Sequence, residues 1–188
     1  MVEIPVVMIA SFFSADQRGG LGNKGTLPWP HHPEDMQWFR DITMGHIVIM
    51  GRRTWEDAKM PKPLPGRKVY VVTSAPIPGV SCLTSGNPVQ DILAVRDSWS
   101  NRDSNIFIIG GSRLIEETKD LHDQAYIAHR KGAYFSDVRI DLHKYLMGMR
   151  IMSSAPSEDR TLNFCTYKNI DIFRPIYETV SKHTTTNT

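Results

Sequence analysis

The sequence predicts an α/β fold: a single domain with a mostly parallel eight-stranded sheet flanked by helices, and an antiparallel C-terminal edge strand. Two observations predict it. Short apolar runs rich in β-branched residues recur along the chain, and each has the length of a buried strand. Several runs lead through a glycine into a helix start, whereas the last ones follow one another without a strong helix between them. We therefore expect parallel strands first and antiparallel pairing at the C-terminal edge.

Length and composition limit the class of protein. The 188 residues suit one domain, which we place at residues 1–180, followed by a disordered polar tail at 181–188. A net charge of +2 without a run of Lys or Arg argues against nucleic acid as a partner. No apolar run is long enough for a membrane span, and the N-terminus does not resemble a signal peptide. Cys82 and Cys165 are isolated thiols. We expect a cytoplasmic protein, and a monomer because no large apolar stretch is exposed.

The elements are predicted in the following order. The first strand covers residues 6–13, an apolar run that fits a strand buried on both faces. Further strands are expected at 46–50, 69–73, 80–83, 105–109 and 124–130, and helices from Pro33, from Pro88 to about Trp99 behind an Asn87 cap, and at 112–119. Residues 134–142 and 162–168 are predicted as the seventh and eighth strands, 147–160 as a loop, and 170–176 as a final apolar stretch.

Residues 19–43 contain a glycine-rich loop, a Leu-Pro-Trp-Pro corner and a short helix. The glycines allow the loop to fold over a ligand or to move, and the prolines stiffen its exit. In the helix, Asp35 shares a face with Trp38, Phe39 and Ile42, so its carboxylate points toward an apolar surface. Such a carboxylate has a raised pKa and is a candidate functional group. The alternative is a first-turn acid that faces water.

Two segments offer positive charge to an anion. The strand at 46–50 runs into residues 51–54, a glycine, two arginines and a threonine, at the start of a helix. Helix N–H groups and arginines suit a phosphate, although solvated arginines would give the same pattern. Arg67 ends a proline-rich loop, where it could hold a carboxylate or simply face water.

Two further pairs lie where open α/β sheets place ligands. Thr73 and Ser74 end a strand, and Gly110 and Gly111 separate a strand from a helix. Each pair alone is a weak signal for a nucleotide. Arg113 lies in the first turn of the next helix, where the helix dipole disfavours a cation, so either a bound anion or a salt bridge would explain it.

Other kinds of chemistry lack their motifs. The sequence has no Gly-x-Ser-x-Gly elbow and no P-loop, which argues against a serine hydrolase and a P-loop nucleotidase. His31 and His32 are adjacent and point apart, and no third ligand is at hand. We therefore predict no metal site and interpret these residues as two loop histidines.

Taken together, the motifs resemble the dihydrofolate reductase family. They occur in the family's order and near its usual spacings, and they cover about residues 6–140, with a weaker match to the end. The matching segments are Leu21-Gly22 with Leu27-Pro28-Trp29-Pro30, Asp35 with Trp38-Phe39, Val48 through Glu56, Pro63 through Arg67, and Ile108 through Ser112.

The resemblance implies a reaction and its partners. The family transfers a hydride from NADPH to C6 of 7,8-dihydrofolate, with a proton added at N5, and so supplies tetrahydrofolate to one-carbon and thymidylate metabolism. Antifolate inhibitors such as methotrexate would bind in the same site. Asp35 matches the family's one acid, which would orient the pterin and favour its protonated form, while a water would deliver the proton to N5. The resemblance also implies a mostly parallel eight-stranded sheet with an antiparallel last strand.

Other residues match the family's binding positions. The substrate positions are Ile9, Ala10, Leu27, Phe39, Arg67 and Ile109, among which Arg67 matches the arginine that grips the glutamate α-carboxylate. The cofactor positions are Ala10, Leu21, Gly22, Gly51, Arg52, Arg53, Thr54, Thr73, Ser74, Ile109, Gly110, Gly111, Ser112 and Arg113. Within that set, the pyrophosphate contacts are Gly110, Gly111 and Thr54, and the pocket for the adenosine 2′-phosphate is Arg52, Thr73, Ser74 and Arg113.

The chain departs from the family's pattern in three places. Ala128 stands where the family usually has a threonine that hydrogen-bonds the catalytic carboxylate, so Asp35 has one fewer partner. Residues 59–62 lengthen the loop over the substrate tail, and extra residues precede Gly22 in the mobile loop. We expect these changes to affect substrate affinity more than the type of reaction.

Two alternatives share the fold. The first is a reductase of another pterin or pyrimidine substrate, such as the reductase of riboflavin synthesis, and Asp35 with the Leu-Pro-Trp-Pro corner argues against it. The second is a structural component that binds folate or NADPH without turnover. A catalytically silent protein should have lost the acid or the phosphate pocket, and the sequence retains both.

Overall fold

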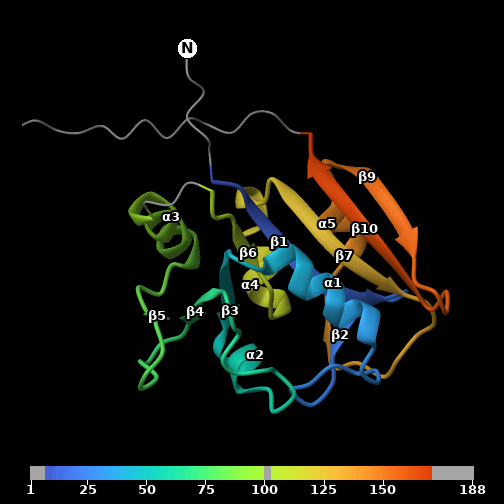
Figure 1. The fold of residues 1–188 in the computed structure, drawn as a ribbon, viewed down its shortest axis with the longest axis horizontal. Helices are drawn as coiled ribbons and strands as arrows, with labels where there is room; N and C mark the ends of the chain where they lie inside the picture. The colour runs from blue at the N-terminus through green and yellow to red at the C-terminus, as the bar shows by residue number, and fades with distance from the viewer. Residues whose placement is uncertain (1–6, 100–102, 171–188) are drawn as a thin grey trace, which may run out of the picture.

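The computed structural model describes residues 7–99 and 103–170, which form a large central sheet with helices packed on it (Figure 1). Three sequence predictions lie partly or wholly outside these ranges: the first residue of the predicted strand at 6–13, nearly all of the apolar stretch at 170–176, and the tail at 181–188. No helix in the described part of the chain is long and apolar enough to cross a membrane.

The central sheet has eight strands in the order β5-β4-β3-β6-β1-β7-β10-β9. Neighbouring strands are parallel except for β10, which runs antiparallel to both β7 and β9. The predicted mostly parallel sheet with an antiparallel C-terminal strand is therefore confirmed. The strands are β1 (Ile9–Asp16), β3 (Ile47–Gly51), β4 (Lys68–Val72), β5 (Cys82–Leu83), β6 (Ile106–Ile108), β7 (Gln124–Arg130), β9 (Met149–Pro156) and β10 (Leu162–Asn169).

Helices cover both faces of the sheet, which makes a three-layer structure. A small second sheet pairs β2 (Gly20–Gly22) with β8 (Val138–Arg139). The α-helices are α1 (Pro33–Thr43), α2 (Arg52–Glu56), α3 (Pro88–Ser98), α4 (Ser112–Glu117) and α5 (Leu142–Leu146), and a 3-10 turn η1 (Lys119–Leu121) follows α4. The predicted Asn87 cap of α3 is confirmed, because its side chain accepts a hydrogen bond from the Gln90 backbone N–H.

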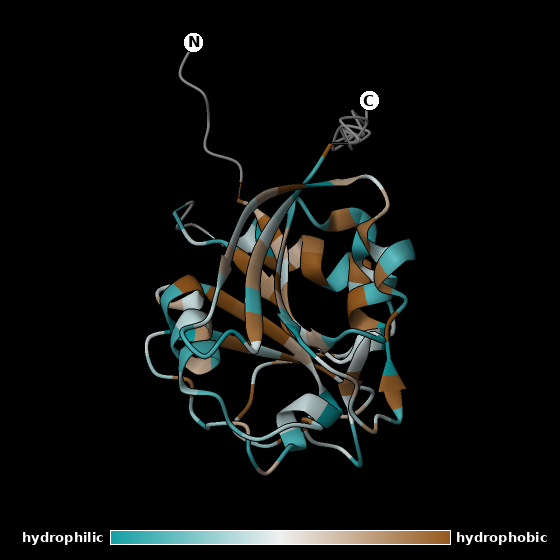
Figure 2. Ribbon diagram, turned by 90° about the vertical axis from the view of Figure 1, so that its right-hand side faces the viewer, coloured by the Kyte–Doolittle hydropathy of each residue, from teal (hydrophilic) through white to brown (hydrophobic). Residues whose placement is uncertain are grey.

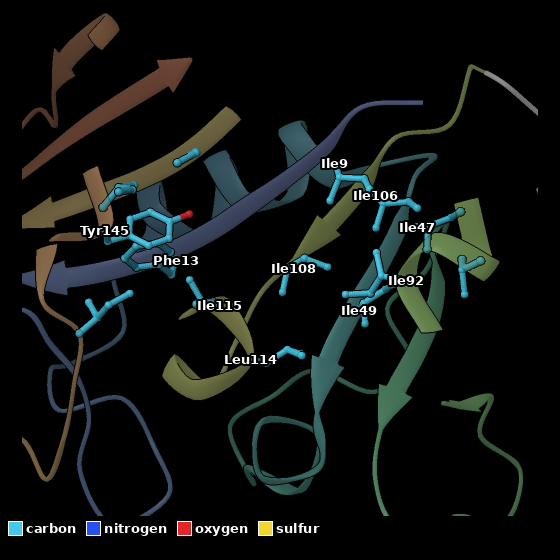
Figure 3. Packing of buried hydrophobic residues seen from close by; sticks show 14 of the residues in the cluster. Ile9, Phe13, Ile47, Ile49, Ile92, Ile106, Ile108, Leu114, Ile115 and Tyr145 are labelled. Carbon is cyan, nitrogen blue, oxygen red and sulfur yellow. The ribbon is translucent and has the colours of Figure 1, made fainter. Parts of the chain in front are cut away.

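The larger core lies between the sheet and helices α3, α4 and α5. Ile9, Ile47 and Ile106 pair across three neighbouring strands, and Phe13 meets Tyr145 of α5 further along β1 (Figure 3). The opposite face of the sheet packs against α1 and α2 through two smaller clusters. Figure 2 shows the same arrangement, with hydrophobic colour concentrated on the inner strands and hydrophilic colour on helix surfaces and loops. The side chains of β1 therefore alternate between two buried faces.

Two predictions for the C-terminal third are wrong. The segment 147–160 is not a loop, because it contains β9, the edge strand of the main sheet. Its side chains are nearly all exposed, so the strand lacks the apolar pattern that predicts one. The segment 134–142 is not a strand of the main sheet: only Val138–Arg139 is extended, and it pairs with β2. The short helix α5, which begins at the Asp141 cap, was not predicted because five residues show no clear helical period.

Candidate active site

Asp35 lies in the first turn of α1 and faces the sheet. Only 7% of its surface is exposed. The predicted apolar stripe is confirmed, since the rings of Trp38 and Phe39 on the same helix pack at an angle against Phe12 of β1, with centroids 4.8 and 5.2 Å from that of Phe12. Ile42 packs against the same cluster. The alternative of an acid facing water is therefore wrong for Asp35.

The environment of Asp35 favours its neutral form. Burial raises the pKa of this carboxyl above its ordinary value, while the hydrogen bond from Ser14 and the charges of Arg130, His32 and His31 lower it in part. The net direction is upward. The sequence predicted this shift from the apolar face of the helix, and the structure adds the groups that oppose it.

The Ser14 hydroxyl takes the role of the threonine that the family usually has at position 128. Its Oγ donates to Asp35, 2.9 Å from Oδ2 and 3.1 Å from Oδ1. Ser14 and Ala128 are register partners on the parallel strands β1 and β7, and Ala128 is fully buried. Ser14 was not predicted as a site residue, because the predicted first strand ends at Phe13. The alternation of Phe12, Ser14 and Asp16 toward one face was the signal that could have found it.

Arg130, the last residue of β7, is a second neighbour of Asp35 that the sequence analysis missed. Its Nη2 lies 4.0 Å from Asp35 Oδ2, and its side chain is almost wholly buried. The guanidinium carbon lies 5.0 Å from the centroid of the Trp29 ring, and Trp29 in turn packs against Tyr134. A cation at the end of an otherwise buried strand was the available signal.

A groove runs from α1 toward the proline-rich loop. It has a volume of about 280 Å³ and contains Phe39 and Arg67. The Arg67 guanidinium carbon lies 5.5 Å from the Phe39 ring centroid, and Nη1 donates to Thr43 Oγ1 at 3.2 Å. Partial burial, and to a smaller extent the charge of Arg40, lowers the pKa of Arg67. The remaining lining residues are Met36, Arg40, Met44, Pro61, Leu64 and Pro65.

The two glycines at 110 and 111 lie against the start of α2. The Gly51 N–H donates to the Gly110 carbonyl at 2.7 Å, which places the starts of α2 and α4 side by side. Gly110 has a φ of +131°, and a Cβ there would lie 3.3 Å from Thr54 Oγ1. The positive φ favours glycine at this position, and the contact would also be tight for a side chain. The structure thus brings Thr54, Gly110 and Gly111 together, as the resemblance implies.

Arg52 and Arg113, the two arginines of the predicted phosphate pocket, each form an ion pair with a glutamate one turn later in the same helix. Arg52 Nε lies 2.7 Å from Glu56 Oε1, and Arg113 Nε lies 2.6 Å from Glu117 Oε1. The salt bridge offered as one explanation of Arg113 is therefore present. Exposed ion pairs of this spacing are weak because solvent screens them, so they leave both arginines available to an anion.

The remaining residues of that pocket differ in exposure. The Thr73 hydroxyl donates to the Ala75 carbonyl at 2.9 Å within its own turn, whereas Ser74 is exposed. Ser112 is half-buried in the first turn of α4.

The glycine-rich loop is fixed at its base and open at its tip. Gly20 and Gly22 pair with β8, and the Asp16 carboxylate accepts hydrogen bonds from the backbone N–H groups of Arg18, Gly20 and Tyr134. Leu21 packs against the larger core, while Leu27 is exposed. Between the tip and α2 lies a cavity of about 450 Å³, lined by Lys24, Gly25, Thr26, Arg53, Glu56, Asp57, Ala58 and Lys59.

Ile9 and Ala10 lie on opposite faces of β1. Ile9 is buried in the larger core, away from α1, so the structure does not bring it to the site. Ala10 is wholly buried on the α1 side, in the cluster that contains Phe39 and Ile109, about 13 Å along the strand from Ser14. The strand continues to Asp16, which brings Ser14 to Asp35. Ile109 directly follows β6 and packs in the clusters that contain Phe39.

The structure places a third polar group beside the histidine pair. His32 Nε2 lies 3.1 Å from Asp159 Oδ2, and the donor atoms of His32, Glu34 and Asp159 lie within 4.8 Å of one another. The statement that no third ligand is near is therefore wrong, because the turn between β9 and β10 was not predicted. Hydrogen bonds from Ser157 and Thr161 hold the pKa of Asp159 well below its usual range. This network ties the turn to the start of α1, and the absence of a metal stays a prediction.

Comparison with known proteins decides the family. The family model described as dihydrofolate reductase matches residues 8–168 of the chain. The chain belongs to the dihydrofolate reductase family. It is 36% identical to the dihydrofolate reductase of Bacillus subtilis (strain 168) over 120 residues, which cover 64% of this chain and 67% of the relative. It is 32% identical to dihydrofolate reductase type 9 of Escherichia coli over 149 residues, which cover 77% of this chain and 81% of the relative.

A solved structure supports the same assignment. The dihydrofolate reductase from Enterococcus faecalis, complexed with NADP(H) and RAB-propyl, superposes with a TM-score of 0.73 at 27% sequence identity. The alignment covers 87% of this chain and 97% of that one. Dihydrofolate reductases are NADPH-dependent oxidoreductases, so the predicted family, activity and cofactor are confirmed.

Proposed function

We propose that this chain reduces dihydrofolate at a site formed by Asp35, the groove over Phe39 and the turn at Gly110. The observation that carries this assignment of the site is the buried Asp35 carboxylate, held by the Ser14 hydroxyl one helical turn before Phe39. A carboxylate at the start of a helix, with an aromatic ring beside it, suits a flat, nitrogen-rich heterocycle. NADPH supplies the hydride when it is bound.

Asp35 acts on the pterin ring by orientation and by charge. Its two oxygens accept hydrogen bonds from the 2-amino group and N3, which fixes the ring in one direction. Its negative charge favours the protonated pterin, and the proton for N5 arrives through a water. Phe12, Trp38 and Phe39 form an apolar wall that keeps bulk water from the ring.

The substrate tail follows the groove along α1. Phe39 packs against the pterin and the benzoyl ring, and Arg67 binds the glutamate α-carboxylate through paired N–H donors. The groove's volume of about 280 Å³ and the position of Arg67 in it support this assignment. Leu27 covers the pterin from the loop side.

The cofactor residues fit a dinucleotide that carries an extra phosphate. Gly110, Gly111 and Thr54 would hold the pyrophosphate, since the backbone is bare of Cβ where a phosphate must approach. Arg52, Arg113, Thr73 and Ser74 would hold the 2′-phosphate, and two arginines favour NADPH over NADH. The residues that complete the cofactor site are Leu21, Gly22, Gly51, Arg53, Ile109 and Ser112.

Three further proposals concern the setting of the protein. Methotrexate and other antifolates bind in place of dihydrofolate, because they present a similar ring to Asp35. The protein acts as a monomer in the cytoplasm, where NADPH is available. Sedimentation at micromolar concentration tests the oligomeric state.

The deciding experiment follows NADPH absorbance after dihydrofolate is added to the purified protein. We expect a decay that methotrexate stops. Decay with a different pterin or a pyrimidine but not with dihydrofolate would favour a reductase of another substrate. Tight methotrexate binding without any turnover would favour a structural role.

A further inference from the structure

Arg130 is a buried cation that the roles above leave unexplained. Only 5% of its surface is exposed. Its Nε and Nη2 atoms are buried and have no hydrogen-bond partner among the described residues. A charge removed from water without full hydrogen bonding is costly. Such a group persists where it serves a site.

Asp35 is the acid on which the charge of Arg130 acts. The 4.0 Å between Nη2 and Oδ2 is an ion-pair distance without a direct hydrogen bond, and both side chains are at least nine-tenths buried. Asp16 lies opposite Arg130 in the strand register, but its oxygens accept from three backbone N–H groups. The Trp29 ring also contacts the guanidinium, whose carbon lies 5.0 Å from the ring centroid.

The positive groups near Asp35 are Arg130, His32 and His31. Among them, the charge of Arg130 acts most strongly on this carboxylate. The titratable groups that face Asp35 or its histidine neighbours from the adjoining loop, helix and turn are His31, His32, Glu34 and Asp159.

We propose that Arg130 is a positioning and specificity-determining residue, which holds the Asp35 carboxylate in place and weakens binding of ligands that enter the pocket as cations. The proposal rests on the proposed function, in which the ligand ring binds against Asp35. A cationic ring and Arg130 would share one carboxylate in a site with little water, where like charges repel strongly. A neutral ring avoids this repulsion.

Two ligands of similar shape differ in this respect. Dihydrofolate carries a 2-amino-4-oxo ring, whereas methotrexate carries a more basic 2,4-diamino ring that gains a proton when it pairs with a carboxylate. Arg130 should therefore lower the affinity for methotrexate more than the affinity for dihydrofolate. It acts through Asp35 and does not itself contact the reacting atoms.

The test compares a neutral and a charged replacement. Arg130→Met removes the charge and keeps the length, and Arg130→Lys keeps the charge. The Michaelis constant for dihydrofolate and the inhibition constant for methotrexate are measured across neutral pH. We expect Arg130→Met to improve methotrexate binding relative to dihydrofolate about tenfold, and Arg130→Lys to stay within about twofold of the wild type. An unchanged ratio in Arg130→Met, or equal changes in both variants, would overturn the proposal, since equal changes indicate packing alone.

Two controls keep the result interpretable. Dihydrofolate turnover by the wild type is measured in the same assay: its absence rejects the proposed function, whereas turnover with an unchanged ratio rejects only the role of Arg130. If Arg130→Met does not fold, calorimetry of methotrexate binding to the wild type in two buffers gives the proton uptake. Uptake well below one proton per ligand at mildly alkaline pH agrees with the proposal, and uptake of a full proton overturns it.

Discussion

Ser14 donates its hydroxyl hydrogen bond to Asp35 from the strand position directly opposite Ala128. The hydroxyl that the family usually supplies from the strand corresponding to β7 comes here from β1. The carboxylate keeps a partner, although the donor is a different residue on a different strand. This exchange explains how a chain with alanine at 128 can retain the same acid.

The exchange predicts a rescue. Ser14→Ala should lower kcat/KM for dihydrofolate about tenfold to a hundredfold, because a hydrogen bond to a charged group contributes about 1.5–3 kcal/mol. Adding Ala128→Thr should restore most of that loss, since a hydroxyl returns from the register partner. Steady-state kinetics at neutral pH measure both steps.

Ser11→Ala is the matched control on the same strand. The Ser11 hydroxyl lies 2.6 Å from that of Tyr145 on the opposite face of the sheet, so this variant should lose stability and keep its kcat/KM. A double variant no better than Ser14→Ala alone would contradict the exchange of donors.

A second prediction concerns stability and pH. Burial raises the pKa of Asp35, so the folded state binds its proton more tightly than the unfolded state. Burial of the ionised carboxylate therefore costs stability above the raised pKa, and this cost disappears as the pH falls toward the ordinary value of 3.8. Asp35→Asn should melt about 2–4 °C higher than the wild type at neutral pH, the size of a change of about 1 kcal/mol in a chain of this length. The difference should vanish in acid, and a lower melting temperature at neutral pH would refute this reasoning.

A third prediction tests the groove. Arg67→Ala should raise the Michaelis constant for dihydrofolate about tenfold or more and leave kcat similar, because the lost bond is made equally in the ground state and the transition state. Lys62→Ala is the control, since Lys62 Nζ donates to the Trp55 carbonyl at 2.6 Å and lies over the Trp55 ring. If Lys62→Ala raises the constant and Arg67→Ala does not, the carboxylate is bound at Lys62.

A fourth prediction uses the salt bridge between Arg52 and Glu56. Arg52→Ala should narrow the preference for NADPH over NADH about tenfold, through the loss of a charged partner for the 2′-phosphate. Glu56→Gln should act in the opposite direction and lower the Michaelis constant for NADPH, because it frees Arg52. Equal preference ratios in the wild type and Arg52→Ala would assign the phosphate to Arg113, Thr73 and Ser74 instead.

The sequence predicted the parts of the site that depend on local pattern. Asp35 and Phe39 are one helical turn apart, and their shared face follows from the period of the helix. Ser14 and Arg130 could not be found in this way, because they reach Asp35 through the pairing of β1 with β7, which local pattern does not encode. Ile9 was misplaced for the same reason, since a strand that is predicted to end at Phe13 changes which residues are expected beside α1.

In the fold, too, local pattern predicted some elements and missed those that depend on strand pairing. Most of the parallel strands are buried and apolar, and the predicted positions of all of them agree with the structure to within a few residues. The edge strand β9 escaped prediction because exposed Arg150, Ile151 and Met152 follow no alternation that local sequence can reveal. This segment is a strand because its backbone pairs with β10 in an antiparallel ladder, which lies beyond the reach of local sequence.

The most direct test of the central role of Asp35 is the rate of hydride transfer in a single turnover, measured by stopped flow with NADPH and dihydrofolate for the wild type and Asp35→Asn. We expect the variant to fold and bind NADPH, to lose most hydride transfer at neutral pH, and to recover part of it in acid, where free dihydrofolate protonates in solution. A rate equal to that of the wild type at neutral pH would contradict the assignment of Asp35 as the catalytic acid of this site.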